Sequence, residues 1–510
     1  MDSSPRICRR RFPLVTRASW IVLTFVALGY AGFIYQAGSP YAAGADSSGY
    51  LNSARLLTLG RLTEAARTIP GLDPPEWDYF YHQPLGYVVK PRTVLMAPIY
   101  PVGLPLHYFV ASLAVGLEKT ARVVNAFNVL AAGLLLYALG CQLGLARSWA
   151  LSGTALLWAC PVWIYHSLQP LSDCVATTWT LAAVVFALRS TTQPRWALAA
   201  GAAFAVAVLV RPTSILALAP IALALGRPGR SWLLFALGGL PGAVCWGWYN
   251  FQVYGGVLNS GYTQGGQDLW SAFGAQFVSV NLRHFATWIP RLLSWPVVIS
   301  AIVGLPWLLR HHGRIAWLLL LWVAAFVGFY ISYFCAGETW GYLRFLLPAF
   351  PAVILAALLA GQRAAEYLKG DARYGVPIAL LAVCLGLQVS LARDLAVTDV
   401  RQGERNYWLA AHWLDAHVPS DAILLSMQLS GTIMFYNTQP LVRWDQIDRT
   451  AFEVLQRTAA RQHRALYAPL FAFEKSRLQE RLGGEWTAVG HAGDVTIWQP
   501  AVIAAPKATP

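Results

Sequence analysis

The stretch PRICRRRFPLVTR (5–17), followed directly by ASWIVLTFVALGYAGFIYQ (18–36), decides the fold class of this chain. Five arginines precede an uncharged, apolar run that is long enough to cross a bilayer as a helix. No clear small-residue cleavage site follows the run, and more apolar runs come later, so a signal peptide is disfavoured. We interpret 18–36 as the first transmembrane helix, with the basic N-terminus in the cytoplasm.

Composition supports this interpretation over the whole chain. Of 510 residues, 56% are hydrophobic and only 12% are charged, whereas soluble domains carry about 25% charged residues. So few charges exclude a disordered chain and disfavour a soluble globular protein. The seven cysteines lack metal-ligand spacing and none lies in the last 120 residues, so the sequence predicts neither a disulfide framework nor a metal site.

Ten further apolar runs follow the first. They lie near 121–142, 148–168, 172–189, 196–210, 213–226, 231–249, 292–309, 315–334, 344–362 and 375–392. The two short runs on either side of Arg211-Pro212 could instead form one broken helix, which would move every later loop to the other side. The sequence therefore predicts an all-α polytopic membrane protein of about eleven transmembrane helices, followed by a small C-terminal α/β domain.

The net charge of +14 records the orientation in the membrane. Residues 1–390 carry 26 Lys and Arg against 12 Asp and Glu, whereas residues 391–510 carry 12 of each kind. With eleven spans, the cytoplasmic side receives 15 basic and three acidic residues, as the positive-inside rule requires. We therefore expect a multi-pass protein of the cytoplasmic membrane with an extracytoplasmic C-terminal domain. A nucleic-acid partner is disfavoured because topology explains the basic excess.

The predicted domains are a transmembrane module, 1–392, and an extracytoplasmic α/β domain, 393–510. Within the first, 38–120 and 250–291 are large outer loops. The run 97–117 contains three prolines, and we expect a helix that lies in the outer interface or re-enters from it. In the second, helices are expected at 406–417 and 473–482, and strands at 421–427, 440–444 and 494–500.

Carboxylates are scarce in the membrane module, and none lies at the centre of a predicted span. Asp46 opens the amphipathic segment ADSSGYLNSARLLTLGRL (45–62), whose apolar side includes Tyr50. Asp173 opens the span that follows PLS, and Glu338 lies in a short outer loop. Each has a plain alternative role, because Asp46 and Asp173 could cap helices and Glu338 could be an ordinary loop charge. Their outer position indicates a site at the outer membrane surface.

Few basic residues accompany these acids on the outer side. They are Lys90, Arg92, Arg122, Arg211 and Arg344. A basic side chain at a helix end is often an interfacial anchor. Together, these side chains could instead surround the phosphate of a membrane-embedded lipid.

Several segments, taken in order, resemble one family. They are Asp46 to Leu62, YPVGLPL (100–106) with Lys90-Pro91 upstream, Arg122 before Asn125, PLSD (170–173), LVRPTSILALAP (209–220), WYNFQVYGGVLNSGY (248–262) and YLRFLLPAFPAVILAA (342–357). This series is similar to bacterial GT-C fold glycosyltransferases, the group of protein O-mannosyltransferases and aminoarabinose transferases. The chain departs from the family pattern at Ser47, where many relatives carry a second acid, and at Phe345, which replaces a tyrosine.

The resemblance implies transfer of a sugar from a polyprenyl-phosphate donor to a hydroxyl of a glycan, lipid or protein acceptor at the outer membrane face. In that interpretation Asp46 is the general base and Asp173 positions a substrate. Lys90, Arg92, Arg344 and Arg211 bind the donor phosphate, and Glu338, Arg122 and Tyr50 are further candidates. The cofactor requirement, including a divalent metal, stays open.

Three other functions compete with this one. A transporter or lipid flippase is disfavoured because no charge lies at mid-membrane and no inverted repeat is visible. A lipid-glycan ligase or polymerase would place its catalytic loop late in the chain, whereas the long loop comes first here. A non-enzymatic assembly factor that only binds lipid also remains open.

Overall fold

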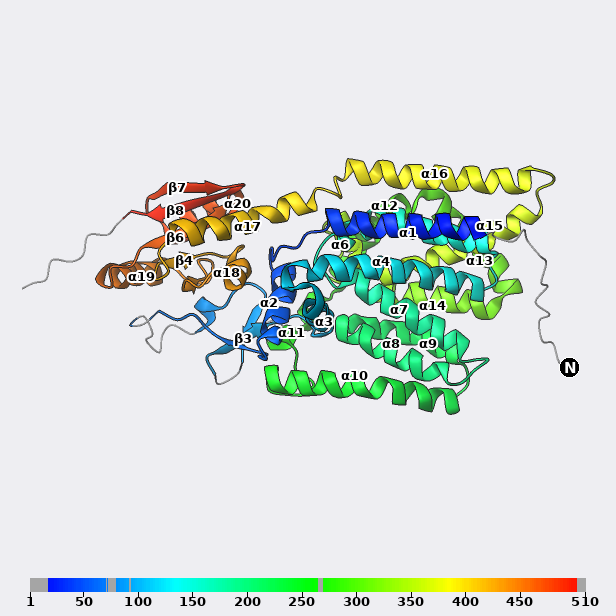
Figure 1. Cartoon of the computed structure of the whole chain (residues 1–510), viewed down its shortest axis with the longest axis horizontal. Helices are drawn as coiled ribbons and strands as arrows, with labels where there is room; N and C mark the ends of the chain where they lie inside the picture. Colours follow the sequence, from blue (N-terminus) through cyan, green and yellow to red (C-terminus); the bar gives the residue numbers. More distant parts are fainter. Residues whose placement is uncertain (1–16, 70, 72–78, 91–92, 265–268, 502–510) are drawn as a thin grey trace, which may run out of the picture.

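The computed structural model describes residues 17–69, 71, 79–90, 93–264 and 269–501. Long helices run along the major axis of the molecule, and a sheet formed by the C-terminal residues lies at one end of them (Figure 1). The segment between the first two long helices is placed where the helical body meets the C-terminal region. Arg92 lies outside the described residues.

The helical body follows the predicted apolar runs closely. Its elements are α1 (Arg17–Ala37), α4 (Leu117–Gln142), α5 (Arg147–Ala159), α6 (Pro161–Ser167), α7 (Asp173–Arg189), α8 (Trp196–Val210), η2 (Pro212–Ala217), α9 (Leu218–Leu225), α10 (Arg230–Tyr254), α12 (Ala275–Leu293), α13 (Trp295–His311), α14 (Gly313–Tyr330), η4 (Trp340–Ala349), α15 (Phe350–Glu366) and α16 (Ala372–Asp394). Several breaks fall at prolines, such as Pro161 and Pro212, because proline removes a helix donor and restricts the residue before it.

Five helices in the described part of the chain are long and apolar enough to cross a membrane, or six if the bent pair α12–α13 counts as one span. The five are α4, α10, α14, α16 and the continuous η4–α15 segment. The remaining predicted runs are helical but shorter or interrupted. The chain is thus mainly helical with membrane-spanning segments, and the number eleven stays a prediction.

Burial separates the central helix from the peripheral ones. In α7, 13 of 17 residues are buried, whereas in α16 only Cys384 and Gln388 are. A helix that is apolar on all sides lies either in a core or in lipid. The sequence of α7 therefore places its N-terminus, which carries Asp173, inside the helical body.

The outer segment between α1 and α4 contains more than the expected interfacial helices. It holds α2 (Asp46–Thr58), β1 (Glu64–Ala65), η1 (Tyr79–His82), β2 (Tyr87–Val89), β3 (Leu95–Pro98) and α3 (Gly103–Val115). The three strands form an antiparallel sheet in the order β1-β3-β2. The expected helix over 97–117 was therefore wrong at its start, because residues 97 and 98 pair in β3 and the helix begins only after Pro101. The lipid-facing role of α3 stays a prediction.

The second outer loop, between α10 and α13, is partly helical. It contains α11 (Gly261–Gln264) and η3 (Leu269–Ala272) before α12 begins. Gly261 lies directly against the backbone of Ile99, where an added Cβ would be 2.2 Å from the Ile99 Cα. This contact joins the two outer loops and fixes the neighbouring Tyr262.

The C-terminal region alternates helices and strands, as the sequence predicts. It consists of α17 (Val400–His417), β4 (Ile423–Leu425), α18 (Ser430–Tyr436), β5 (Leu441–Val442), α19 (Arg449–Arg461), β6 (Leu466–Phe471), α20 (Ala472–Leu482), β7 (Trp486–Ala492) and β8 (Val495–Pro500). The sheet order is β5-β4-β6-β8-β7, with β5, β4 and β6 parallel and β8 antiparallel to both its neighbours. Four of these elements, α18, α19, β6 and β7, were not predicted from the sequence. β6 passes directly into α20 without a Gly, Pro or other turn residue to mark its end. β7 is mostly exposed and has an irregular register at Gly490, so its sequence lacks a regular alternation of apolar and polar residues.

The C-terminal region is bound to the first outer segment through α18. The Asn52 amide donates to the Gly431 carbonyl at 2.9 Å, and the Thr432 hydroxyl donates to the Ala42 carbonyl at 2.7 Å. These contacts lie on either side of Asp46 in the sequence. The C-terminal region therefore takes part in placing the segment that carries Asp46.

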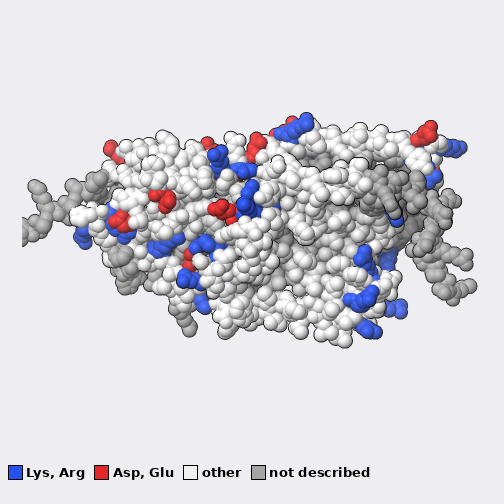
Figure 2. Space-filling view, in the orientation of Figure 1, with Lys and Arg blue, Asp and Glu red and all other residues white. Residues whose placement is uncertain are grey.

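Charge is distributed unevenly along the major axis. Figure 2 shows Lys and Arg side chains gathered at the end of the helical body far from the C-terminal sheet, and mixed charges at the sheet end. A zone with few charges lies between the two ends. This pattern is typical of a membrane protein whose basic end faces the cytoplasm.

Candidate active site

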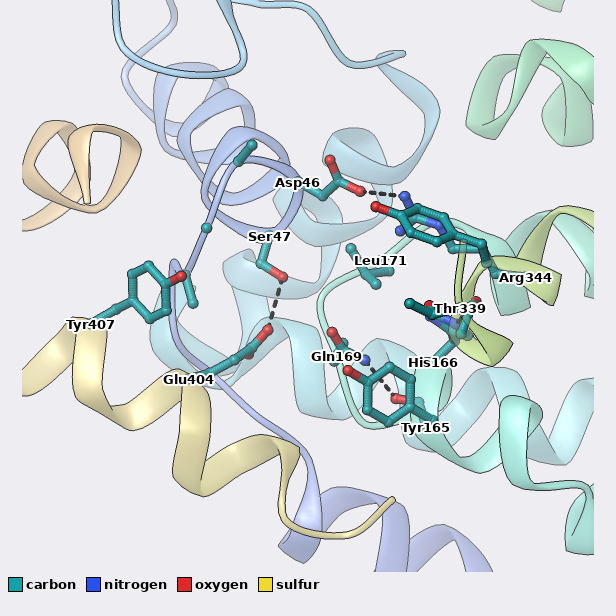
Figure 3. A pocket seen from close by; sticks show the side chains of 15 residues that line it. Asp46, Ser47, Tyr165, His166, Gln169, Leu171, Thr339, Arg344, Glu404 and Tyr407 are labelled. Carbon is teal, nitrogen blue, oxygen red and sulfur yellow. Dashed lines mark hydrogen bonds and ion pairs between the residues drawn. The ribbon is translucent and has the colours of Figure 1, made fainter. Parts of the chain in front are cut away.

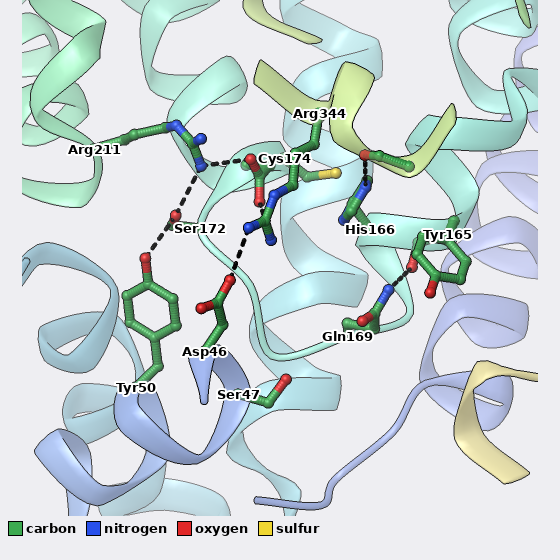
Figure 4. A network of polar contacts seen from close by, with 12 residues as sticks. Asp46, Ser47, Tyr50, Tyr165, His166, Gln169, Ser172, Cys174, Arg211 and Arg344 are labelled. Carbon is green, nitrogen blue, oxygen red and sulfur yellow. Dashed lines mark hydrogen bonds and ion pairs between the residues drawn. The ribbon is translucent and has the colours of Figure 1, made fainter. Parts of the chain in front are cut away.

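Asp46 is the first residue of α2, and its carboxylate does not cap the helix. Instead, Oδ2 lies 2.9 Å from an Arg344 guanidinium nitrogen (Figure 4). Oδ1 accepts a hydrogen bond from the Tyr100 hydroxyl at 2.9 Å. The side chain keeps 36% of its surface exposed. A carboxylate accepts about four hydrogen bonds, so Asp46 retains free acceptor capacity toward solvent.

Arg344 joins the two carboxylates that the sequence singled out. It lies in η4, and its other terminal nitrogen is 4.0 Å from Asp173 Oδ2. Its Nε is buried without a hydrogen-bond partner in the described part of the chain. One guanidinium therefore bridges α2 and α7, a geometry that the planar fork of Arg permits and that Lys does not.

Asp173 is also the first residue of its helix and makes no side-chain cap. It is 1% exposed, and its Oδ1 accepts from Arg211 at 2.5 Å. Arg211 has an extended backbone (φ −149°, ψ 111°) because a residue before proline is disfavoured in the helical region. Pro212 thus ends α8 at the point where the Arg211 side chain meets Asp173.

The four charged side chains form one cluster of zero net formal charge. Phe345 lies beside both cations, with its ring centroid 5.2 Å from the Arg211 guanidinium and 5.4 Å from that of Arg344. Cation–π attraction contributes to holding both guanidiniums in place. A phenylalanine meets this need without the hydroxyl of the tyrosine that occupies this position in the family pattern.

Tyr50 and Tyr100 line the other side of the cluster. The Tyr50 hydroxyl donates to Ser172 Oγ at 2.8 Å, and the two tyrosine rings lie 4.9 Å apart. Tyr50 is a site residue predicted from the sequence, whereas Tyr100 and Ser172 are not. Both residues belong to motifs that indicated the family resemblance, Tyr100 to YPVGLPL and Ser172 to PLSD. The motifs therefore pointed to the right segments, although they did not single out these two side chains.

Two cavities meet at Asp46 and Arg344. We call the first, of ≈ 450 Å³, the polar cavity; its lining includes Ser47, Tyr165, His166, Gln169, Glu404 and Tyr407 (Figure 3). We call the second, of ≈ 720 Å³, the apolar cavity; its lining includes Asp173, Arg211, Trp246, Tyr262, Tyr330 and Phe345. Asp46, Leu171, Tyr342 and Arg344 line both cavities. The exposed carboxylate of Asp46 therefore stands at the junction of a polar and a largely aromatic space.

His166 and Glu404, which line the polar cavity, were not among the candidates predicted from the sequence. His166 Nε2 lies 3.0 Å from the Gly341 carbonyl, while its buried Nδ1 has no partner in the described part of the chain. Glu404 enters from α17 and accepts a hydrogen bond from Ser47 Oγ at 3.2 Å. No sequence signal indicates Glu404, because it lies in a different predicted domain from Asp46.

The remaining candidates lie elsewhere. Lys90 Nζ donates to the Gln252 carbonyl at 2.6 Å, and Arg122 lies over the Tyr35 ring at 4.7 Å. Glu338 is exposed, and none of these three residues lines either cavity. Their roles stay predictions, as does that of Arg92. Among the described residues, no group of three or more His, Cys, Asp or Glu side chains is placed to hold a metal ion.

Comparison of the whole structure with solved structures reveals related folds. ArnT from Cupriavidus metallidurans, bound to undecaprenyl phosphate, superposes with a TM-score of 0.60 at 14% identity, over 96% of this chain and 100% of that one. The archaeal oligosaccharyltransferase AglB from Archaeoglobus fulgidus superposes with a TM-score of 0.54 at 10% identity, over 97% of this chain and 76% of that one. That structure is a complex with an inhibitory peptide and a dolichol-phosphate. Arabinofuranosyltransferase AftD from Mycobacteria superposes with a TM-score of 0.56 at 14% identity, over 95% of this chain and 40% of that one.

Sequence comparison adds nothing to this result, because neither protein-family models nor curated proteins give a match. The structural similarity extends over nearly the whole chain. It confirms the resemblance inferred from the motifs at the level of architecture. The chain therefore has the fold of the GT-C glycosyltransferases.

Proposed function

We propose that the chain is a glycosyltransferase that moves a sugar from a polyprenyl-phosphate donor to a hydroxyl of an acceptor at the outer face of the cytoplasmic membrane. The observation that carries this proposal is the position of Asp46, an exposed carboxylate at the junction of two chemically different cavities. A transfer reaction needs one group that both substrates can reach. The lipid phosphates bound by ArnT and AglB support a donor of the same class.

The apolar cavity is the proposed donor site. Its aromatic lining offers flat surfaces against which sugar and isoprenoid groups pack, and Arg211 and Arg344 lie at its polar end. Both guanidiniums have donors left after pairing with Asp46 and Asp173, because each Arg carries five N–H groups. They would bind the donor phosphate and stabilise the charge that develops as the phosphate leaves.

The polar cavity is the proposed acceptor site. An acceptor hydroxyl that reaches Asp46 from this side approaches the sugar from the face opposite the phosphate. Asp46 takes the hydroxyl proton while the oxygen forms a bond to the anomeric carbon and the bond to the phosphate oxygen breaks. Polyprenyl phosphate leaves with one more negative charge than it carried in the donor. A single displacement of this kind inverts the anomeric configuration.

Replacement of Asp46 tests the proposal. Asp46→Asn keeps the shape and the hydrogen bond from Tyr100 but removes the base, so we expect transfer to fall by about 10²- to 10⁴-fold. The assay is sugar transfer from a lipid-linked donor library to envelope extracts, with protein reconstituted in liposomes. Asp415→Asn, an exposed change on α17, is the matched control. Full activity of purified, correctly inserted Asp46→Asn would refute the assignment.

A further inference from the structure

Glu404 is a half-buried residue with a buried carboxyl oxygen, and the proposed chemistry leaves it unused. It lies on α17 and reaches into the polar cavity beside the segment that carries Asp46 (Figure 3). Oε1 accepts from Ser47, the residue next to Asp46. Oε2 is buried and has no hydrogen-bond partner among the described residues. The C-terminal region thus touches the proposed base through a single intermediate residue.

The surroundings of Glu404 offer it no compensating charge. No described Lys, Arg or His forms an ion pair with it. The ionisable and charged groups that face it or share its cavity are Asp46 from α2, Tyr108 from α3, Tyr165 and His166 from α6, Tyr342 and Arg344 from η4, Tyr407 from α17 and Tyr436 from α18. The one guanidinium in this set already pairs with Asp46.

These conditions disfavour the ionised form. Burial, which the nearby Ser39 and Ser47 hydroxyls offset only in part, raises the pKa of Glu404 to about 8. A protonated carboxyl can remain in this position at neutral pH without a cation. The ionised form would place a negative charge without an ion-pair partner in a desolvated position, which costs free energy.

We propose that Glu404 is a positioning residue that acts as a neutral carboxylic acid, holding the segment from Ser39 to Ser47, and with it Asp46, against the C-terminal region. Ionisation of Glu404 weakens this contact and withdraws Asp46 from the junction of the cavities. The inference rests on the proposed function for its catalytic consequence, but the contact itself does not depend on it.

The test compares Glu404→Gln, which keeps the size and polarity but cannot ionise, with Glu404→Ala and with the parent chain. Transfer rates are measured from pH 6 to pH 9.5. The parent rate is expected to fall about tenfold per unit above pH 8, as it does when only one protonation state is active. Glu404→Gln should keep the parent rate at pH 7 within about threefold and lose this decline. Glu404→Ala should be slower than both at pH 7, because the contact with Ser47 is gone.

Glu480→Gln, an exposed change on α20, is the matched control and should keep the parent pH profile. A decline above pH 8 that persists in Glu404→Gln would overturn the inference. So would loss of transfer by Glu404→Gln at pH 7, since that result would require the carboxylate itself.

A second measurement does not depend on activity. The difference between the melting temperatures of Glu404→Gln and the parent is expected to increase from pH 5 to pH 8, in favour of the variant. Above pH 8 this difference should be constant. A constant difference would refute the neutral-acid role even if the chain proved to have another function. Widening of the difference, together with full activity of Asp46→Asn, would overturn the proposed function but leave the contact intact.

Discussion

Arg344 holds the site together at the scale of single residues. It forms ion pairs with both Asp46 and Asp173, and it lines both cavities. Loss of the Arg344 charge would leave Asp173, which is 1% exposed, with one arginine instead of two, and this destabilises the fold. Replacement by alanine would therefore confuse folding with catalysis, whereas a charge-conserving change separates them.

We expect Arg344→Lys to fold and to lose about 10²-fold in kcat. Lysine keeps the positive charge near Asp46 and Asp173 but cannot bridge them while it also binds a phosphate. Steady-state kinetics with the lipid donor and a thermal melt give the two readings. The exposed pair of variants Arg477→Lys and Arg477→Ala serves as the control for nonspecific effects. A rate for Arg344→Lys within threefold of the parent would count against a bridging role.

At the scale of elements, α2 and the loop before α3 fit together through a glycine. A Cβ added at Gly49 would lie 2.1 Å from the Tyr100 ring. Tyr100 is 5% exposed, so its ring has little room to move away. The absence of a side chain at Gly49 is thus what lets the Tyr100 hydroxyl reach Asp46.

Gly49→Ala is expected to lower transfer by about 10- to 100-fold, because displacement of Tyr100 moves a hydrogen-bond partner of the base. Overpacking costs about 1–3 kcal/mol, and the better helix propensity of alanine offsets about 1 kcal/mol of this. Stability should therefore change less than activity. Gly386→Ala in α16, where no atom lies within 4 Å of the new methyl group, is the matched control. Parent-like kinetics in Gly49→Ala would show that Tyr100 does not need its present position.

At the scale of the whole molecule, the outer segment depends on the C-terminal region for its place. Gly431 in α18 lies so close to α2 that an added Cβ would be 2.1 Å from Ser48 Oγ. The same glycine accepts the hydrogen bond from Asn52. The docking surface between α18 and α2 is therefore close-packed directly behind the residues that line the polar cavity.

Gly431→Val should separate the two regions without unfolding either. We expect transfer to fall by at least about tenfold, because Ser47 and Asp46 lose their support. Circular dichroism should remain that of the parent, while proteases should cut the outer segment or the α16–α17 connection faster. Gly403→Ala in α17, a site open on all sides, should change neither property. Parent-like activity and protease resistance in Gly431→Val would refute this coupling.

Glu404 of α17, which contacts Ser47 of α2, makes the docking of the C-terminal region on the outer segment sensitive to pH. Its pKa in the docked state, about 8, lies above the ordinary value for glutamate, so the docked state binds the proton more tightly than the undocked state. Docking is consequently most favourable at low pH and weakens as pH rises from the ordinary value toward 8, where the docked state itself loses the proton. This sign is opposite to that of a carboxylate whose ionised form is stabilised by an ion pair in the docked state.

The sequence by itself determined the class of the protein and most of the charged cluster. Apolar runs are local properties, and every predicted run is helical. Asp46, Asp173, Arg211 and Arg344 could be singled out because charges are rare in a membrane module, where each needs a partner or a function. The prolines next to Arg211 and in the YPVGLPL motif set the end or the start of a helix by restricting the backbone of their own neighbours.

Only the tertiary structure decided which of these residues meet. Asp46 and Arg344 are far apart in the sequence, and their contact depends on how α2, α7 and η4 pack, which no local periodicity records. The same reason explains why Lys90, Arg122 and Glu338 lie outside both cavities, while Tyr100 and Glu404 lie within them. Side-chain direction and long-range packing, rather than residue type, separate these two groups.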